Sequence, residues 1–262
     1  MADDSVKKTL QVALGICLVC SLLVSTAAVS LSTRQQRNKR IDQISNILVA
    51  GGLYSEDIDV EQTYNENIVP VMIDMESGEK VGEDQFDDIL NPEDFDIKAV
   101  AEHPLYGQDI PADLDLANIG RRPKIMLVYL VKQNGEITNV ILPIYGKGLW
   151  STLYGFLALE KDLKTISGIT FYEHGETPGL GGEVDNPAWK ANWNGKQAFD
   201  EDGNVRISVI KGRVDRSRAE AKYQVDGLSG ATITARGVDQ LVKYWLGENG
   251  YGVLLSTLHE AD

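Results

Sequence analysis

The chain has 262 residues and a mass of 28.8 kDa, a size that suits one or two domains with a buried core. Hydrophobic residues make up 43% and charged residues 24%, which excludes collagen-like, low-complexity and wholly disordered proteins. The formal net charge of −14 argues against nucleic acid as a partner, because phosphate backbones are bound by surfaces rich in Lys and Arg.

Residue types that usually hold metals are scarce in this chain. Its two cysteines, Cys17 and Cys20, lie inside one apolar run, where we expect them to act as small apolar residues rather than as a redox pair. The histidines His103, His174 and His259 lie far apart, without metal-ligand spacing. We therefore predict no metal site, and no disulfide in the soluble part.

The first predicted element is an uncharged run of 22 residues, 10–31. As a helix it spans about 33 Å, which matches the roughly 30 Å hydrocarbon core of a bilayer. A cleaved signal peptide is the alternative, but its apolar core usually has only about 7 to 15 residues. We therefore predict a transmembrane helix over 10–31, in contact with the lipid bilayer and preceded by a short segment, 1–9.

Basic residues lie on both sides of this run and bear on its orientation. Lys7 and Lys8 precede it, and four follow it. By the positive-inside rule alone, this balance weakly places the large domain in the cytoplasm. The four that follow are Arg34, Arg37, Lys39 and Arg40.

Acidic residues are concentrated in one region. Between residues 41 and 120 there are 20 Asp and Glu but only two basic residues. The part from Glu83 to Asp115 carries three prolines and little periodicity, which predicts a long solvated segment. A calcium loop is a weaker alternative, because the fixed acidic spacing around a glycine is missing. We expect 32–120 to be an acidic linking and peripheral region.

The pattern changes after Arg121 and predicts an α+β domain over 121–262. Residues 125–131 and 137–144 are rich in β-branched side chains and flank Asn134-Gly135, a strong hairpin signal. Residues 165–172 and 205–211 predict further strands, and 237–246 carries apolar side chains at helical spacing. The fold class is thus an antiparallel sheet with packed helices, preceded by one transmembrane helix.

Two glycine-rich loops follow predicted strands and are candidate binding sites. Glycines let a backbone approach a ligand closely, and an aromatic side chain supplies a wall. In the second loop His174 and Glu176 are either an acid/base pair or partners that hold the loop together by hydrogen bonds. The candidate residues are Gly146, Lys147, Gly148 and Trp150 in the first loop, and Glu176, Thr177, Leu180 and Gly181 in the second.

A third stretch, Asp226 to Thr234, precedes the predicted helix. One Ser or Thr here is explained as a helix N-cap, but three hydroxyl residues need another reason. A helix N-terminus with glycine and hydroxyl residues also suits a phosphate, because its N–H groups are unpaired. A serine nucleophile is disfavoured, because the pattern is not GxSxG.

Asp226, Ser229, Gly230, Ala231 and Thr232 in this stretch match the flavinylation motif D-x-x-[ST]-G-A-T. Together with GKGLW, ETPGLGG and the single N-terminal anchor, the chain resembles the NqrC family of the sodium-translocating NADH:quinone oxidoreductases, whose members carry an FMN-binding domain. The resemblance covers nearly the whole chain. Only the stretch from Glu83 to Asp115 has no match.

The resemblance implies a one-electron carrier whose FMN is esterified through its phosphate to Thr232. The two glycine loops would then hold the flavin ring and ribityl chain, and Lys147 and Lys211 are candidates to stabilise negative charge on the reduced ring. The implied partners are five other subunits and a flavin transferase that uses FAD. The family also implies a bacterial inner-membrane protein with residues 1–9 in the cytoplasm and the large domain in the periplasm, against the charge count.

Two alternatives remain open on the sequence alone. One is the equivalent flavin subunit of the related ferredoxin:NAD oxidoreductase complexes, which shares the flavin motif. The other is a membrane-tethered scaffold domain without a cofactor, in which the glycine loops only form turns. In each case the chain alone is not expected to catalyse a reaction.

Overall fold

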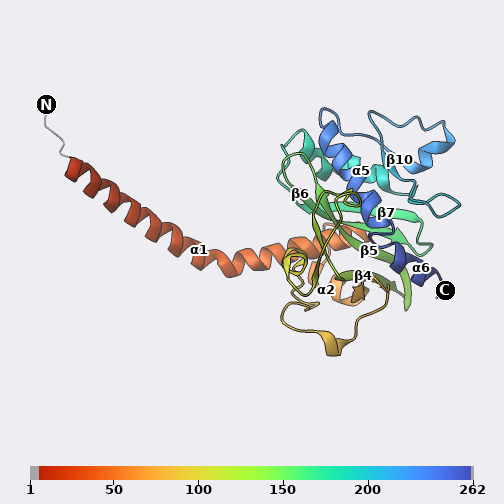
Figure 1. The fold of residues 1–262 in the computed structure, drawn as a ribbon, viewed down its shortest axis with the longest axis horizontal. Coiled ribbons are helices and arrows are strands. Elements are labelled where there is room, and N and C mark those ends of the chain that lie inside the picture. The colour runs from red at the N-terminus through yellow and green to blue at the C-terminus, as the bar shows by residue number, and fades with distance from the viewer. Residues whose placement is uncertain (1–5, 261–262) are drawn as a thin grey trace. The chain divides into compact units, whose positions relative to one another are not determined.

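The computed structural model describes residues 6–260, and the chain divides into two compact units at residue 44. Helix α1 runs from Val6 to Ala50 and is drawn in red and orange in Figure 1. Within it, Val6–Ser32 is long and apolar enough to cross a membrane. The predicted segment 10–31 lies inside this stretch, so the first unit is suited to anchor the chain in a bilayer.

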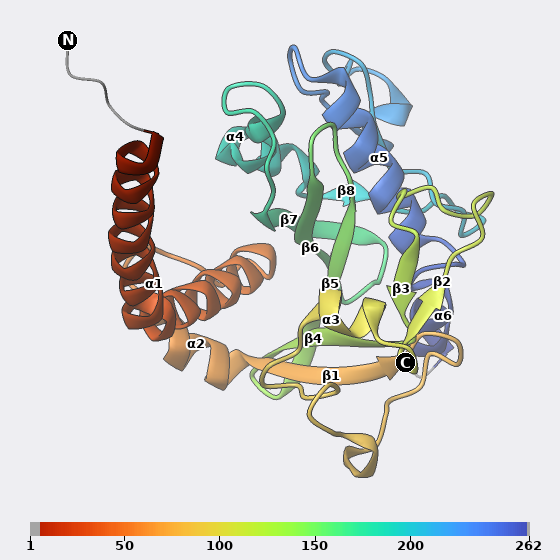
Figure 2. The ribbon, with the colours of Figure 1, turned by 60° about the vertical axis from the view of Figure 1, so that its left-hand side comes forward.

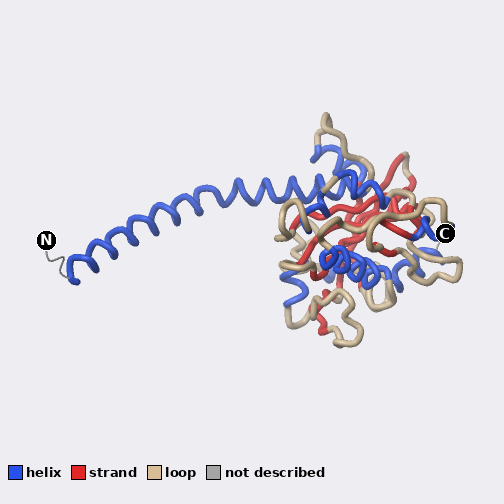
Figure 3. Tube along the Cα trace, turned by 90° about the horizontal axis from the view of Figure 1, so that it is seen from above, coloured by secondary structure: helices blue, strands red, loops and turns tan. Residues whose placement is uncertain are grey.

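A six-stranded antiparallel sheet forms the centre of the second unit, in the order β1-β4-β5-β6-β7-β8. Figure 2 shows the long strands side by side, and Figure 3 shows them in red among helices and loops. The strands are β1 (Ile68–Asp74), β4 (Ile125–Gln133), β5 (Glu136–Lys147), β6 (Thr152–Glu160), β7 (Thr165–Glu173) and β8 (Lys196–Gln197).

The predicted hairpin is confirmed. Strands β4 and β5 pair across Asn134 and Gly135, which have φ angles of 52° and 89°. Asn and Gly tolerate this left-handed conformation, and it matches the twist of the two strands. The predicted strand 165–172 is confirmed as β7.

Both faces of the sheet are buried, which explains why β4 is apolar without alternation. Met126 and Val128 lie in one core cluster, together with residues of helix α5 (Thr232–Leu246). Leu127 and Tyr129 lie in the other, together with residues 44–50 at the end of α1. Helix α5 begins five residues before the predicted helix 237–246 and ends where it was expected.

The acidic region contributes more to the core than its composition indicates. Strand β1 pairs with β4 along its whole length, and Met72 is 1% exposed. In the stretch predicted to be solvated, Leu90 and Val100 are also buried. The elements of this region are α2 (Val60–Asn67), η1 (Glu83–Gln85), α3 (Ile97–Glu102), β2 (Gly107–Asp109) and β3 (Arg121–Pro123).

The strand predicted over 205–211 is wrong except at Ser208–Val209, which forms β9 with β10 (Gln224–Val225). The Asp239 carboxylate accepts hydrogen bonds from the Ser208 hydroxyl and from the Val209 N–H, so this segment bonds to side chains and loops instead of extending a ladder. The remaining elements are η2 (Gly181–Asp185), α4 (Pro187–Lys190), η3 (Ala191–Trp193), η4 (Ala219–Tyr223) and α6 (Gly252–Glu260).

Candidate functional site

The three candidate loops converge on the N-terminal half of α5. The backbone oxygen of Lys147 lies 2.3 Å from where a Cβ on Gly237 would stand. Similarly, a Cβ on Gly181 would lie 2.6 Å from the Thr234 hydroxyl, and one on Gly230 would lie 3.2 Å from Leu180. Segments separated by up to 90 residues in the sequence thus pack closely at one helix end.

Glu176 links these segments through one buried carboxylate, which is 4% exposed. Its Oε2 accepts a hydrogen bond from the Thr234 hydroxyl at 2.6 Å. Its Oε1 accepts the backbone N–H groups of Trp150 at 2.9 Å and Ser151 at 3.1 Å, and the Leu149 N–H lies 3.3 Å from Oε2. The carboxylate therefore ties the β5–β6 turn to α5.

These contacts set the charge state of Glu176. Burial alone would raise the pKa of its carboxyl group, but the hydrogen bonds from Thr234 and from the turn N–H groups lower the pKa below its ordinary value. Glu176 is thus held as a carboxylate. His174 uses Nδ1 to accept the Glu176 N–H, and its Nε2 lies 2.7 Å from Asp185. The hydrogen-bonding interpretation of this loop is the one that the structure supports.

The glycines of the first loop have a different role from the one predicted. We expected Gly146 and Gly148 to allow close approach of a ligand, but a Cβ on Gly146 would lie 2.4 Å from Leu241, and one on Gly148 would lie 2.7 Å from Glu176 Oε1. Both positions thus need glycine because protein atoms, namely α5 and the Glu176 carboxylate, occupy the space.

The N-terminus of α5 is open. Ala231 is the N-cap residue and makes no side-chain hydrogen bond to the helix, so the expected Ser or Thr cap is absent. Thr232 is the first helical residue and is exposed, whereas Thr234 is 1% exposed and is bound to Glu176. The first turn therefore presents one free hydroxyl and unpaired N–H groups to solvent.

Apolar side chains are exposed on the segments that meet here. Trp150 is 68% exposed, which is unusual for so large an apolar side chain. An accessible hydroxyl, an open helix N-terminus and nearby apolar surface together suit a ligand with both a phosphate and a flat apolar ring. The exposed apolar residues are Leu149, Trp150, Leu180 and Ile233.

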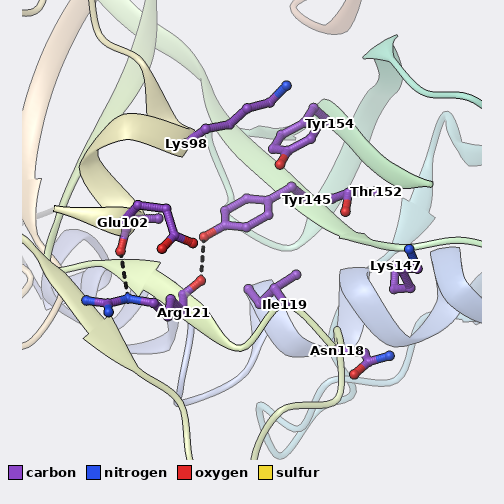
Figure 4. A pocket seen from close by; sticks show the side chains of 10 residues that line it. Lys98, Glu102, Asn118, Ile119, Arg121, Tyr145, Lys147, Thr152 and Tyr154 are labelled. Atoms are coloured by element: carbon purple, nitrogen blue, oxygen red, sulfur yellow. Dashed lines mark hydrogen bonds between the residues drawn. The ribbon is translucent and has the colours of Figure 1, made fainter.

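Other residues of the predicted site have structural contacts or lie elsewhere. The Asp226 carboxylate accepts the Val214 N–H at 2.7 Å, and its backbone oxygen accepts the Trp189 indole N–H. Lys211 is exposed on a neighbouring loop. Ser229 and Thr177 are exposed. The Lys147 side chain is not part of the Glu176 cluster, and lines a separate pocket with Tyr145 and Tyr154 (Figure 4).

Thr234 supports the candidate site through Glu176, and the sequence analysis did not assign it this role. It shares the buried face of α5 with Val238 and Leu241, at positions i, i+4 and i+7. A hydroxyl on an apolar helix face needs a buried hydrogen-bond partner, which is the signal that would have identified it.

Comparison with known proteins identifies the family to which this part of the chain belongs. Residues 148–247 match the family model described as FMN-binding domain. The chain is 44% identical to the NqrC protein of the Na(+)-translocating NADH-quinone reductase of Pseudomonas aeruginosa, over 99% of this chain and 98% of that protein. It is 43% identical to the corresponding protein of Yersinia pestis, over 98% of this chain and 95% of that protein.

Solved structures give the same result. The crystal structure of NqrC from Shewanella oneidensis aligns with a TM-score of 0.77 and 32% identity, over 85% of this chain and 99% of that chain. The corresponding crystal structure from Parabacteroides distasonis aligns with a TM-score of 0.62 and 29% identity, over 86% of this chain and 97% of that chain. The α+β fold predicted from the sequence is thereby confirmed.

Proposed function

Because this chain belongs to the NqrC family of the Na(+)-translocating NADH-quinone reductases, we propose that it carries FMN as a phosphoester of Thr232 and relays electrons one at a time within that complex. The main support for the proposal is that the Thr232 side chain is exposed at the start of α5, where no side chain caps the helix. Similarity over nearly the whole chain favours this complex over the ferredoxin:NAD oxidoreductase alternative.

The environment of each hydroxyl supports Thr232 as the attachment site rather than Thr234. Both threonines lie in the first turn of α5. The Thr234 hydroxyl is buried and bound to the Glu176 carboxylate, so a transferase cannot reach it without breaking the core. Thr232 is exposed and needs no such rearrangement.

The residues around Thr232 fit FMN in both of its parts. The unpaired N–H groups of the first turn of α5 would hold the phosphate, because a helix N-terminus favours an anion. The exposed side chains of Leu149, Trp150 and Leu180 would contact the flavin ring. When bound, FMN supplies the electron-transfer chemistry, and the protein supplies position and electrostatics.

A covalent bond suits an acidic carrier. With a net charge of −14, the protein would hold a free phosphorylated flavin weakly, whereas attachment makes its local concentration permanent. In the attachment step, the Thr232 oxygen forms a bond to the FMN phosphorus of FAD. The pyrophosphate bond of FAD breaks, AMP leaves, and the hydroxyl proton is released.

The partners and location follow from the same assignment. As a member of this family the chain is one subunit of an oxidoreductase complex, and we propose five other subunits and a flavin transferase as its partners. The apolar stretch Val6–Ser32 would anchor it in the bacterial inner membrane. We propose that the large unit lies in the periplasm. This assignment runs against the positive-inside rule, which is statistical, because more basic residues follow the helix than precede it.

Intact mass spectrometry tests the attachment. The full chain is produced with and without a flavin transferase, and we expect the co-produced protein to gain the mass of one FMN less one water. Thr232→Ala should gain nothing, whereas Thr257→Ala, the same change at an exposed threonine on α6 and outside the motif, should retain the added mass. A wild-type chain with only its polypeptide mass, or a modified Thr232→Ala chain, would contradict the proposal.

A further inference from the structure

A second pocket lies at the end of the β5–β6 hairpin. Its cavity has a volume of about 360 Å³ and opens beside the terminal strand pair Lys147 and Thr152 (Figure 4). The Tyr145 ring lies 5.0 Å from the ring of Trp245 on α5, and the Lys147 side chain lines the cavity. Neither Glu176 nor Thr232 is among the residues that line this pocket.

The walls of the pocket combine cations with aromatic and apolar surface. Figure 4 shows Tyr145 and Tyr154 side by side, and their rings are stacked with centroids 5.4 Å apart. Positive residues come from separate segments, whereas Glu102 is the single acidic residue lining the cavity. Two of these cations pair with carboxylates beside the cavity, Lys98 with Glu173 and Arg121 with Asp109. The cations are Lys98 on α3, Arg121 on β3 and Lys147 on β5.

Two of the lining groups are free to bind a ligand. Among the described residues, the Lys147 ammonium and the Asn118 amide have no hydrogen-bond or ion-pair partner in the protein. Asn118 has a left-handed backbone conformation, with φ of 53°, which Asn tolerates better than most residues. Lys147 and Asn118 thus supply an unpaired charge and unpaired N–H donors to one cavity.

The other two cations have partners that a ligand can replace. Lys98 bonds to Glu173 at 2.5 Å, and both side chains are about 40% exposed, at 41% and 42%. Arg121 lies 3.4 Å from Asp109, whose side chain is 84% exposed, while the Arg121 Nε donates to the Ala101 backbone oxygen at 3.0 Å and holds the guanidinium in place. Exposed ion pairs contribute little free energy, so exchanging one carboxylate for another costs little.

We propose that this pocket binds a carboxylate on a short carbon skeleton, with Lys147 and Asn118 as its direct contacts and Arg121 as supporting charge. Carboxylate oxygens match the ammonium, amide and guanidinium donors. Ile119 and the two tyrosine rings can contact the carbon skeleton of an organic acid, which a bare inorganic anion lacks. The carboxylate can come from a free organic acid or from an acidic side chain of a protein segment.

Isothermal titration calorimetry on the purified full chain in detergent tests the proposal at constant ionic strength. One arm uses succinate, and the other uses a blocked pentapeptide with a central aspartate. We expect saturable binding of at least one probe, with a dissociation constant in the millimolar range or tighter. Tighter binding of the peptide would identify a protein segment as the source, and tighter binding of succinate a free acid.

Two variants assign the binding to this pocket. Lys147→Gln removes the free charge, and Asn118→Asp keeps the size and the tolerance of a left-handed backbone but repels an anion. Each should weaken binding about tenfold, the loss of one charge-assisted contact. Lys132→Gln changes the same charge on an exposed part of β4 and should leave binding unchanged. Absence of saturable binding in the wild type, or equal binding by all variants, would overturn the proposal.

Discussion

The Thr234 hydroxyl donates a 2.6 Å hydrogen bond to Oε2 of Glu176, and this bond joins helix α5 to the loop that follows β7. The same carboxylate accepts N–H groups from the β5–β6 turn, so a single buried group fixes the positions of three segments around Thr232. Rigid support of this kind is what a site needs when its ligand-contacting residues stand on loops.

The first prediction separates the two threonines. Thr234→Val leaves the buried carboxylate without one of its donors and should lower the free energy of unfolding by about 1 to 3 kcal/mol. Thr232→Val, a matched change on an exposed neighbour, should alter it by less than about 0.5 kcal/mol. Guanidinium unfolding of the full chain, followed by the fluorescence of buried Trp193 and Trp245, measures both.

Flavin attachment should show the opposite pattern. Thr232→Val should lose the covalent FMN, and Thr234→Val should retain it at a temperature where the variant is folded. Equal stability of the two variants would contradict the assigned role of the hydrogen bond.

The second prediction concerns pH. The folded-state pKa of Glu176 lies below its ordinary value of 4.5, so its contribution to stability is present above that pH and is lost as the pH falls through the folded pKa. We expect Glu176→Gln to be less stable than the wild type at neutral pH. Below pH 4.5 the gap should narrow, which thermal unfolding at a series of pH values measures. A constant gap across the series would show that the carboxylate charge does not matter.

The third prediction uses two glycines that neighbour the same carboxylate loop. In Gly148→Ala the new methyl would lie 2.7 Å from Glu176 Oε1 and 2.9 Å from Leu153, so the turn must shift, at a cost of about 1 to 3 kcal/mol. Gly175→Ala places its methyl 3.4 Å from Ser151, which is ordinary contact. The melting temperature should fall in the first variant only. A stable Gly148→Ala protein would mean that the turn is not held tightly.

Local signals predicted the parts of the fold that have local causes. Asn134-Gly135 determines the hairpin through its own backbone preference, and the apolar spacing of residues 237–246 identifies most of α5. The segment 205–211 has strand composition, yet only Ser208–Val209 pairs as a strand, and the Val209 N–H bonds to the Asp239 carboxylate 30 residues away. Contacts at such distances leave no local pattern.

In the candidate site, too, local features were predictable from the sequence and contacts between distant segments were not. The clustering of glycine and hydroxyl residues indicated which loops matter, because those residue types are needed at close contacts. The pattern did not indicate that Gly148 makes room for Glu176 rather than for a ligand, because that depends on a carboxylate 28 positions later in the sequence. No local pattern indicated that the Lys147 side chain lines a separate pocket, because other lining residues, such as Lys98 and Asn118, come from distant segments.

The last prediction concerns the acidic region, which was expected to be peripheral but contains β1, a strand of the central sheet. Met72 of β1 packs in the core cluster that contains Leu127 and Phe156, and it is 1% exposed. Val69 on the same strand is 42% exposed. Met72→Ala should lower the free energy of unfolding by about 2 to 5 kcal/mol, because it leaves a cavity between the sheet and the end of α1. Val69→Ala should cost less than about 1 kcal/mol, since only exposed surface and strand preference change. Denaturant unfolding compares the two, and equal losses would mean that β1 is a peripheral strand after all.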